Sequence, residues 1–226
     1  MKIGILGTGV VSKTLAAKLD TLGHAIVLGT RDPAEARARS GKGNYGDAPL
    51  SELLAAQPGI GLGTFAEAAA HGEIVLNATS GDGSLAALQA AGAGNLDGKV
   101  LVDIANPLDF SRGFPPRLSV GNDDSLAEQI QRAFPGARVV KTLNTVNALL
   151  MVAPQALAGG DHTMFLCGDD AGAKDVARGL LSELGWTDVL DLGGLSNARG
   201  TEAWLLLWTR LYGALQKPMF SLKVVR

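Results

Sequence analysis

The sequence predicts an α/β fold in which a doubly wound parallel sheet is followed by a small C-terminal α/β appendage. Apolar strand-like runs and amphipathic helical patterns alternate through the first two-thirds of the 226-residue chain. The strand-like runs are almost continuously apolar, as expected for parallel strands that are covered on both faces. Six such strands with helical crossovers indicate the doubly wound arrangement.

The elements are expected in a regular order. Strands are predicted at residues 2–6, 25–28, 60–63, 73–78, 99–104 and 137–143, with a helix over 84–91. Capping-box spacing marks helix starts at Thr64–Glu67 and Ser125–Glu128. In the last third, strands at 162–167 and 189–192 alternate with helices at 171–184 and 197–215. We therefore divide the chain into residues 1–150 and a small domain, residues 151–226, packed on the carboxyl edge of the sheet.

A glycine-rich turn follows the first predicted strand. Gly7-Thr8-Gly9-Val10-Val11-Ser12 reads G-x-G-x-x-S and opens the next helix. Gly7 permits the tight turn, Gly9 lets a phosphate approach the backbone, and the small Ser12 lets the helix pack on the strand. The helix N-terminus also presents N–H groups and a positive dipole end to an anion. The turn and its flanking strands therefore predict a dinucleotide-binding βαβ unit of the Rossmann type.

The end of the second strand indicates which dinucleotide binds. NAD-binding sites usually place a carboxylate there, whereas this chain has Thr30-Arg31. An arginine offers a charge-assisted grip on a 2′-phosphate, and Thr30 adds a hydroxyl. Asp32 is interpreted as the N-cap of a helix that begins at Pro33, so its carboxylate is not free for a ribose. The pattern therefore predicts NADP, with Arg37 and Arg39 adding positive charge nearby.

Composition restricts the class of protein. With 46% hydrophobic and 19% charged residues the chain can bury a sizeable core, and its net charge of −2 indicates no nucleic-acid surface. The single cysteine, Cys167, excludes an intramolecular disulfide framework. No signal-peptide pattern or membrane-spanning run is recognised, so we expect a cytoplasmic protein with no membrane partner.

The other predicted strand ends carry small, neutral residues. They are Asn77–Ser80, Ala105–Leu108 and Thr142–Thr145. We expect His24 and His71 at the surface on the opposite edge of the sheet, while the environment of His162 stays open. No nucleophile–base pair or metal-ligand spacing can be assembled, so we predict no catalytic side chain and no metal site. Lys141 is either a catalytic lysine or a structural partner of a carboxylate.

This lack of acid–base groups favours one kind of reaction. Hydride exchange between two redox coenzymes requires chiefly that two rings be held face to face. A dehydrogenase acting on an alcohol would instead need a group to move the hydroxyl proton.

Several segments, in order along nearly the whole chain, resemble the F420-dependent NADP oxidoreductase family. They are residues 1–33, KVLVDIANPLDF, PGARVVKTLNTV, MFLCGDDAGAKDVARGLLSELGW and DLGGLSNARGTEAWLLL. The resemblance implies an NADP-binding Rossmann domain over residues 1–150, a C-terminal domain completing the substrate cleft, and hydride transfer between NADPH and the deazaflavin coenzyme F420 or a flavin-type acceptor.

The resemblance also assigns roles to single residues. It implies that the pyrophosphate binds at Gly7, Thr8, Gly9, Val10 and Val11, the 2′-phosphate at Thr30 and Arg31, and the nicotinamide half against Ala78 and Thr79. Asn106 and Pro107, after the fifth strand, are further candidates for cofactor binding.

Two other functions and one assembly state stay open. The chain could reduce a small carbonyl or imine compound, or it could be a non-catalytic NADP-binding sensor. The stretch from Trp204 to Trp208 is apolar on more than one helical face. It is interpreted as a buried helix, and since one small domain would not cover both faces, we expect a homodimer.

Overall fold

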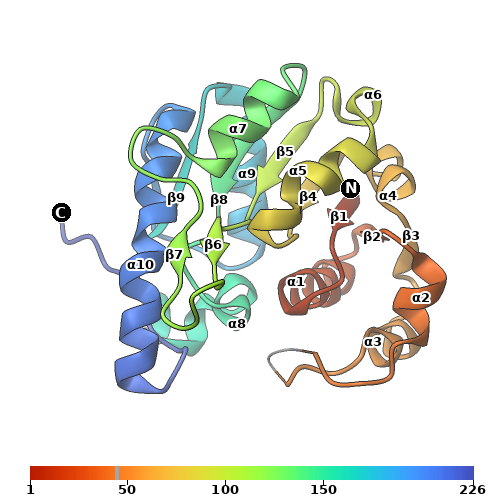
Figure 1. Ribbon diagram of the computed structural model, residues 1–226, viewed down its shortest axis with the longest axis horizontal. Coiled ribbons are helices and arrows are strands. Elements are labelled where there is room, and N and C mark those ends of the chain that lie inside the picture. The colour runs from red at the N-terminus through yellow and green to blue at the C-terminus, as the bar shows by residue number, and fades with distance from the viewer. Residues whose placement is uncertain (44–45) are drawn as a thin grey trace.

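Eight strands form one sheet in the computed structural model, which describes residues 1–43 and 46–226 (Figure 1). In spatial order they are β10 (Val189–Asp191), β9 (Met164–Gly168), β8 (Arg138–Thr142), β5 (Val100–Asp103), β4 (Ile74–Asn77), β1 (Lys2–Leu6), β2 (Ala25–Thr30) and β3 (Gly61–Thr64). All strands from β8 to β3 are parallel, in the order of a dinucleotide-binding doubly wound sheet. The predicted fold class is confirmed.

The late strands lengthen this sheet. β9 pairs antiparallel with β8, and β10 pairs parallel with β9. Residues after 150 were expected to pack on the carboxyl edge of the sheet, whereas β9 and β10 extend the sheet beyond β8. Pairing with β9 satisfies the backbone groups that β8 would otherwise leave exposed at a sheet edge. The connection from β8 contains α8 (Ala148–Val152) and two short 3-10 helices, Pro154–Ala156 and Ala158–Gly160.

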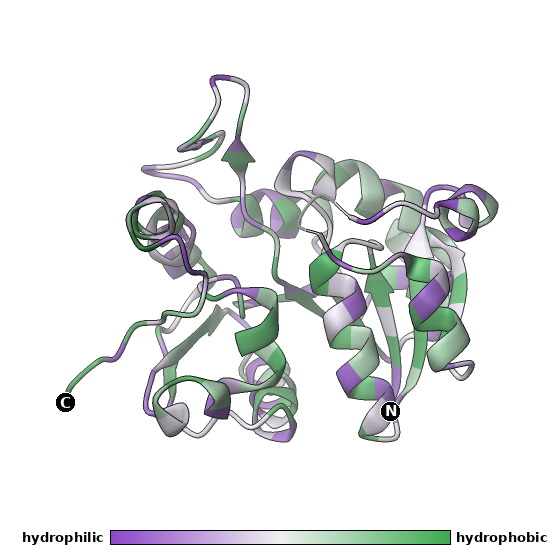
Figure 2. Ribbon diagram, turned by 90° about the horizontal axis from the view of Figure 1, so that it is seen from below, coloured by the Kyte–Doolittle hydropathy of each residue, from purple (hydrophilic) through white to green (hydrophobic). Residues whose placement is uncertain are grey.

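Helices cover both faces of the sheet. One core contains residues of α1 (Val10–Thr21), α3 (Leu50–Ala56), α8 and α9 (Ala171–Glu183). The other contains residues of α4 (Phe65–His71), α5 (Gly81–Ala91), α7 (Leu126–Ala133) and the start of α10 (Ala198–Leu215). Figure 2 shows that the strands between these layers are largely apolar, while the helices mix apolar and hydrophilic residues. The remaining elements are α2 (Pro33–Ala38), α6 (Ala93–Leu96), the 3-10 helix Leu195–Asn197, and the antiparallel hairpin β6 (Leu108–Asp109) and β7 (Arg117–Leu118).

Local capping explains where several helices begin. Asp32 accepts a hydrogen bond from Glu35 N at 2.9 Å, which confirms its predicted role as the N-cap of α2. The capping box of Thr64 and Glu67 is present at α4. At α7, Ser125 accepts from the backbone of Glu128 as expected. α5 begins at Gly81, three residues before the predicted start. Over residues 1–43 and 46–226, no helix combines the length and the apolar character needed to cross a bilayer.

Candidate dinucleotide site

The turn after β1 is held between β2 and β4. Gly7 has φ +113°, and a Cβ built there would lie 2.8 Å from both the carbonyl oxygen of Ala78 and Oγ of Ser12. Gly7 N donates to Gly29 O at 2.8 Å, and the buried Ser12 donates from Oγ to Ala78 O at 3.3 Å. Glycine at position 7 and a small residue at position 12 are therefore both required by contacts within the protein.

The N-terminus of α1 is open to a ligand. Gly9 is the N-cap, the helix has no side-chain cap, and its first turn contains no acidic residue. A Cβ built on Gly9 would meet no atom within 4 Å among the described residues. The first-turn N–H groups and the positive end of the helix dipole thus face space that a side chain would fill, which fits a pyrophosphate.

Arg31 is an exposed cation that has no hydrogen bond or ion pair within residues 1–43 and 46–226. Together with Thr30 and Thr79 it lines a cavity of about 250 Å³. The neighbouring carboxylate of Asp32 is occupied by its capping bond to Glu35 N. A free guanidinium beside hydroxyls is the donor set that suits a 2′-phosphate.

The rest of this cavity is apolar or small. Its other lining residues come from the start of α4 and from along α5, and they are Thr64, Phe65, Ser80, Gly83, Ala86, Ala87 and Ala90. An aromatic ring and three alanine methyl groups suit a flat, largely apolar base such as adenine. The lining is therefore compatible with the adenosine end of NADP.

The remaining predicted residues are placed as follows. Ala78 contributes its carbonyl oxygen to Ser12, and Thr79 lies in the same cavity as Arg31. The side chains of Asn106 and Asn144 are joined, since Asn106 Nδ2 donates to Asn144 O at 3.0 Å and Asn144 Nδ2 donates to Asn106 Oδ1 at 2.9 Å. Pro107 is buried, and neither it nor Asn106 lines the cavity. Their contact with a cofactor stays a prediction.

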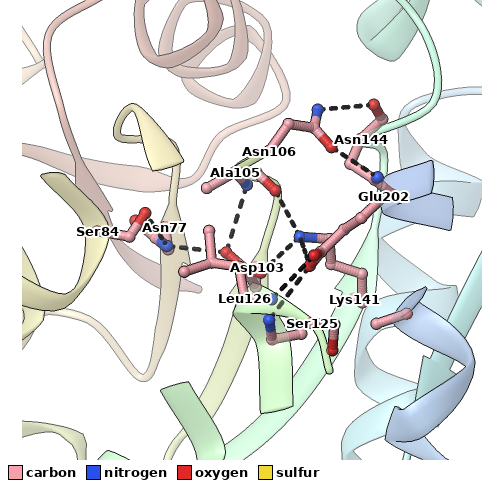
Figure 3. A network of polar contacts seen from close by, with 12 residues as sticks. Asn77, Ser84, Asp103, Ala105, Asn106, Ser125, Leu126, Lys141, Asn144 and Glu202 are labelled. Atoms are coloured by element: carbon pink, nitrogen blue, oxygen red, sulfur yellow. Dashed lines mark hydrogen bonds and ion pairs between the residues drawn. The ribbon is translucent and has the colours of Figure 1, made fainter. Parts of the chain in front are cut away.

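A buried ion cluster lies at the same edge of the sheet (Figure 3). Strand register pairs Asn77 with Asp103 and Asp103 with Lys141, so the three side chains form one row across β4, β5 and β8. Lys141 is completely buried, and its Nζ lies 2.7 Å from Asp103 Oδ2 and 2.8 Å from Glu202 Oε1. It also donates to the carbonyl oxygen of Ala105. Of the two roles considered for Lys141, the structure shows the pairing with carboxylates.

The charges of this cluster are compensated from several sides. Burial alone would lower the pKa of Lys141, but the attraction of Asp103 and Glu202 outweighs it and raises that pKa above its usual value. Glu202 accepts from the backbone N–H of Leu126 at 2.8 Å and of Ala127 at 3.2 Å. The positive end of the α7 dipole therefore faces the second carboxylate, and all three ammonium hydrogens of Lys141 have acceptors.

Two members of the cluster, Asp103 and Glu202, were not predicted from the sequence. Asp103 could have been found, because Asn77, Asp103 and Lys141 each stand at or next to the end of an apolar parallel strand. Glu202 carries no such signal, since it reaches the cluster from α10, far along the chain.

The histidines lie away from the cavity. His24 is only 9% exposed, with Nε2 2.7 Å from Glu183 Oε2, so the expectation of a surface residue was wrong because α9 packs against it. His71 bonds the carbonyl oxygen of Ala25, and the buried His162 bonds that of Pro154, both at 2.9 Å.

Burial raises the pKa of the Cys167 thiol to about 12. Where the chain is described, no three His, Cys, Asp or Glu side chains converge as metal ligands would.

α10 is only partly covered. Trp204 donates from Nε1 to Thr145 O at 2.9 Å, yet within residues 204–208 only Leu205 is buried, and Leu207 is 52% exposed. The interpretation of this stretch as a buried helix was therefore wrong, because one face packs on the sheet layer and the other faces outward. The homodimer stays a prediction.

Comparison with known proteins yields consistent relatives. Residues 2–107 match the family described as NADP oxidoreductase, coenzyme F420-dependent. A crystal structure from Arthrobacter sp. FB24, whose name proposes an F420-dependent NADP reductase, is 54% identical, covers 100% of both chains and superposes with a TM-score of 0.95. An F420-dependent NADP reductase from Methanocaldococcus jannaschii is 29% identical over 90% of this chain and 88% of its own length.

A third relative is longer. Metalloreductase STEAP3 of Rattus norvegicus is 30% identical over 89% of this chain, but the match spans only 36% of that protein. Given a structural relative that matches end to end and the family match that covers the glycine-rich turn, Arg31 and the ends of β4 and β5, the chain belongs to the F420-dependent NADP oxidoreductase family and is an NADP-dependent oxidoreductase.

Proposed function

We propose that this protein transfers a hydride between NADP(H) and the deazaflavin coenzyme F420. The observation that carries the choice of nucleotide is Arg31, an exposed cation that lies beside a cavity and has no partner among residues 1–43 and 46–226. The neighbouring Asp32 carboxylate is already used as a helix cap. The choice of the second coenzyme rests on the family and on the names of relatives that align with most of this chain.

In this proposal the protein binds and orients. Bound NADPH supplies a hydride to a second ring. The open N-terminus of α1 holds the pyrophosphate at Gly7–Val11, and Thr30 and Arg31 hold the 2′-phosphate. Ala78, Thr79, Asn106 and Pro107 are proposed to complete the cofactor site, and residues 151–226 the substrate cleft. A hydride exchange needs no side chain to move a hydroxyl proton, in agreement with the neutral side chains of Ala78, Thr79, Asn106 and Pro107.

Acceptor screening tests the proposal. Purified protein is incubated anaerobically with NADPH and either F420, FMN, a cyclic imine or a ferric chelate, and nicotinamide oxidation is followed by absorbance. We expect F420 to be reduced fastest, with FMN next. Turnover of the imine alone would establish the carbonyl or imine reductase instead. Tight NADPH binding without turnover of any acceptor would indicate a sensor.

We also propose a cytoplasmic homodimer that uses the outward face of α10. Leu207 and Leu215 are each 52% exposed and Tyr212 is 37% exposed on this helix. Sedimentation equilibrium should give twice the chain mass, and Leu207→Glu should shift the protein toward the monomer. A wild-type monomer at micromolar concentration would contradict the dimer.

A further inference from the structure

The buried ion cluster continues as a chain of hydrogen bonds to the cavity. Asp103 Oδ1 accepts from Asn77 Nδ2 at 2.8 Å (Figure 3), and Asn77 Oδ1 accepts from Thr79 Oγ1 at 2.7 Å. Thr79 in turn lines the cavity that contains Arg31. A fully buried lysine is thus linked to a cavity wall through two side chains, Asp103 and Asn77.

The hydrogen bonds of this series are all donated in one direction, from Thr79 to Asn77 and from Asn77 to Asp103. Asp103, paired with the Lys141 ammonium, offers only acceptors, so it fixes the NH2 group of the Asn77 amide toward itself. The amide oxygen of Asn77 must then face Thr79. Because that oxygen can only accept, the single hydroxyl hydrogen of Thr79 is donated to it.

Ser84 does not change this result. Asn77 Nδ2 donates to Ser84 Oγ at 3.1 Å, and Ser84 donates to Ser80 O at 3.1 Å or to Thr79 Oγ1 at 2.9 Å. In either case Thr79 Oγ1 has no hydrogen left and keeps at least one lone pair. The hydroxyl of Thr79, a residue that lines the cavity, is therefore a fixed acceptor.

We propose that Asn77 is a positioning residue that holds the Thr79 hydroxyl as an acceptor for a ribose hydroxyl of the dinucleotide. The inference rests on the proposed function, since it requires NADP in this cavity. Two ribose units could supply the donor. The family resemblance implied that Thr79 contacts the nicotinamide half. The cavity instead places Thr79 with Thr30 and Arg31, so the structure favours the 3′-hydroxyl of the adenosine ribose, which neighbours the 2′-phosphate.

Binding of adenosine 2′,5′-bisphosphate tests the contact, because this probe carries only the adenosine half. By calorimetry, Thr79→Val should weaken binding of this probe and of NADP⁺ by about 3- to 10-fold, the value of one hydrogen bond, and Thr79→Ser should restore it. The 3′-deoxy form of the probe should bind wild type and Thr79→Val equally. A loss seen with NADP⁺ alone would place the donor on the nicotinamide ribose and leave the positioning role intact.

Asn77→Leu tests the relay at nearly constant volume. Asn77→Leu should reduce the affinity for the probe as much as Thr79→Val does. The double variant should bind the probe no more weakly than either single variant. Asn144→Leu is the matched control, because it removes another buried amide at the same sheet edge that bonds Asn106 and Thr201 O but not Thr79. It should reduce the thermal midpoint and leave the affinity for the probe unchanged.

The outcomes separate the two proposals. If wild type binds neither NADP⁺ nor the probe, both proposals fail. If wild type binds both ligands and Arg31→Ala weakens them, but Thr79→Val and Asn77→Leu do not, only the positioning role fails. Equal losses in Asn77→Leu and Asn144→Leu would mean that general loosening of the sheet edge is responsible, which also overturns it.

Discussion

Arg31 and Lys141 both stand at the carboxyl ends of parallel strands, yet their surroundings are opposite. Arg31, after β2, is exposed and has no partner among the residues that the structure describes. Lys141, in β8, is fully buried and contacts two carboxylates and a carbonyl oxygen. The same edge of one sheet therefore holds one cation, Arg31, that can bind a ligand, and one cation, Lys141, whose hydrogen bonds are all made within the protein.

The difference separates ligand binding from architecture. A buried ammonium loses its hydration and is tolerated only when its charge and hydrogens are matched within the protein. That matching leaves Lys141 no capacity for a ligand. An exposed guanidinium has no such requirement, so Arg31 retains its hydrogen-bond donors for an anion. The number of partners within the protein, rather than charge alone, distinguishes the binding residue Arg31 from the structural residue Lys141.

The largest effect is expected on stability, when the charge of the buried Lys141 is removed. Lys141→Met leaves Asp103 and Glu202 buried without their counter-charge and should lower the free energy of unfolding by about 3–5 kcal/mol. Urea unfolding followed by circular dichroism measures it. Lys174→Met is the control, because Lys174 pairs with Asp191 at 3.0 Å near the surface and should contribute at most about 1 kcal/mol. Similar small losses in both variants would refute the distinction.

Filling the space beside Gly9, where the pyrophosphate is proposed to bind, should weaken nucleotide binding and leave the stability of the fold unchanged. Gly9→Val places a branched side chain where the first-turn N–H groups of α1 face open space, so NADPH affinity should fall by about 100-fold or more. Fluorescence titration of NADPH gives the affinity. Gly179→Val, inside α9, also meets no atom within 4 Å and should leave NADPH affinity unchanged. Undiminished binding by Gly9→Val would show that the phosphates lie elsewhere.

Local sequence patterns were sufficient to predict the backbone structure around Arg31. The glycine turn, the Asp32 cap and the strand spacing are all encoded within about thirty residues, and the structure has the turn, the cap and the βαβ unit that they predict. What these patterns do not encode is the set of contacts that complete the site, such as Thr79 in the same cavity as Arg31. Those depend on β4 pairing beside β1.

The region around Lys141 could be predicted only in part. An apolar strand with an inward lysine implies a carboxylate partner, but Glu202 arrives from α10 and no short-range pattern links the two. The placement of β9 was missed for a related reason. Its apolar run is compatible with a separate small sheet, and only the unpaired edge of β8 in three dimensions decides that it joins the main sheet antiparallel.

Arg31→Ala tests the available cation directly. Loss of a charge-assisted contact should weaken NADPH binding by about 1.5–3 kcal/mol and leave NADH binding nearly unchanged, because only NADPH carries the 2′-phosphate. Titrations of both nucleotides measure it. Arg37→Ala removes an exposed cation on the neighbouring α2 and should affect NADPH far less. Equal losses for NADPH and NADH would exclude Arg31 from nucleotide selection.

The smallest effect is expected on stability, when the charge of the partly exposed Asp188 is removed. Asp188 accepts from Thr163 Oγ1 at 2.6 Å and pairs with Lys223 and Arg226, which lowers the pKa of Asp188 to about 2. Its pKa in the unfolded chain is about 3.9, so its stabilisation is complete above that value and is lost as pH falls toward 2. Asp188→Asn should therefore cost about 1 kcal/mol or less at pH 7, and the difference from wild type should narrow between pH 4 and 2. Urea unfolding at pH 7, 4.5 and 2.5 measures this difference. A difference that stays constant over this range would mean that ionisation of the Asp188 carboxylate does not contribute to stability.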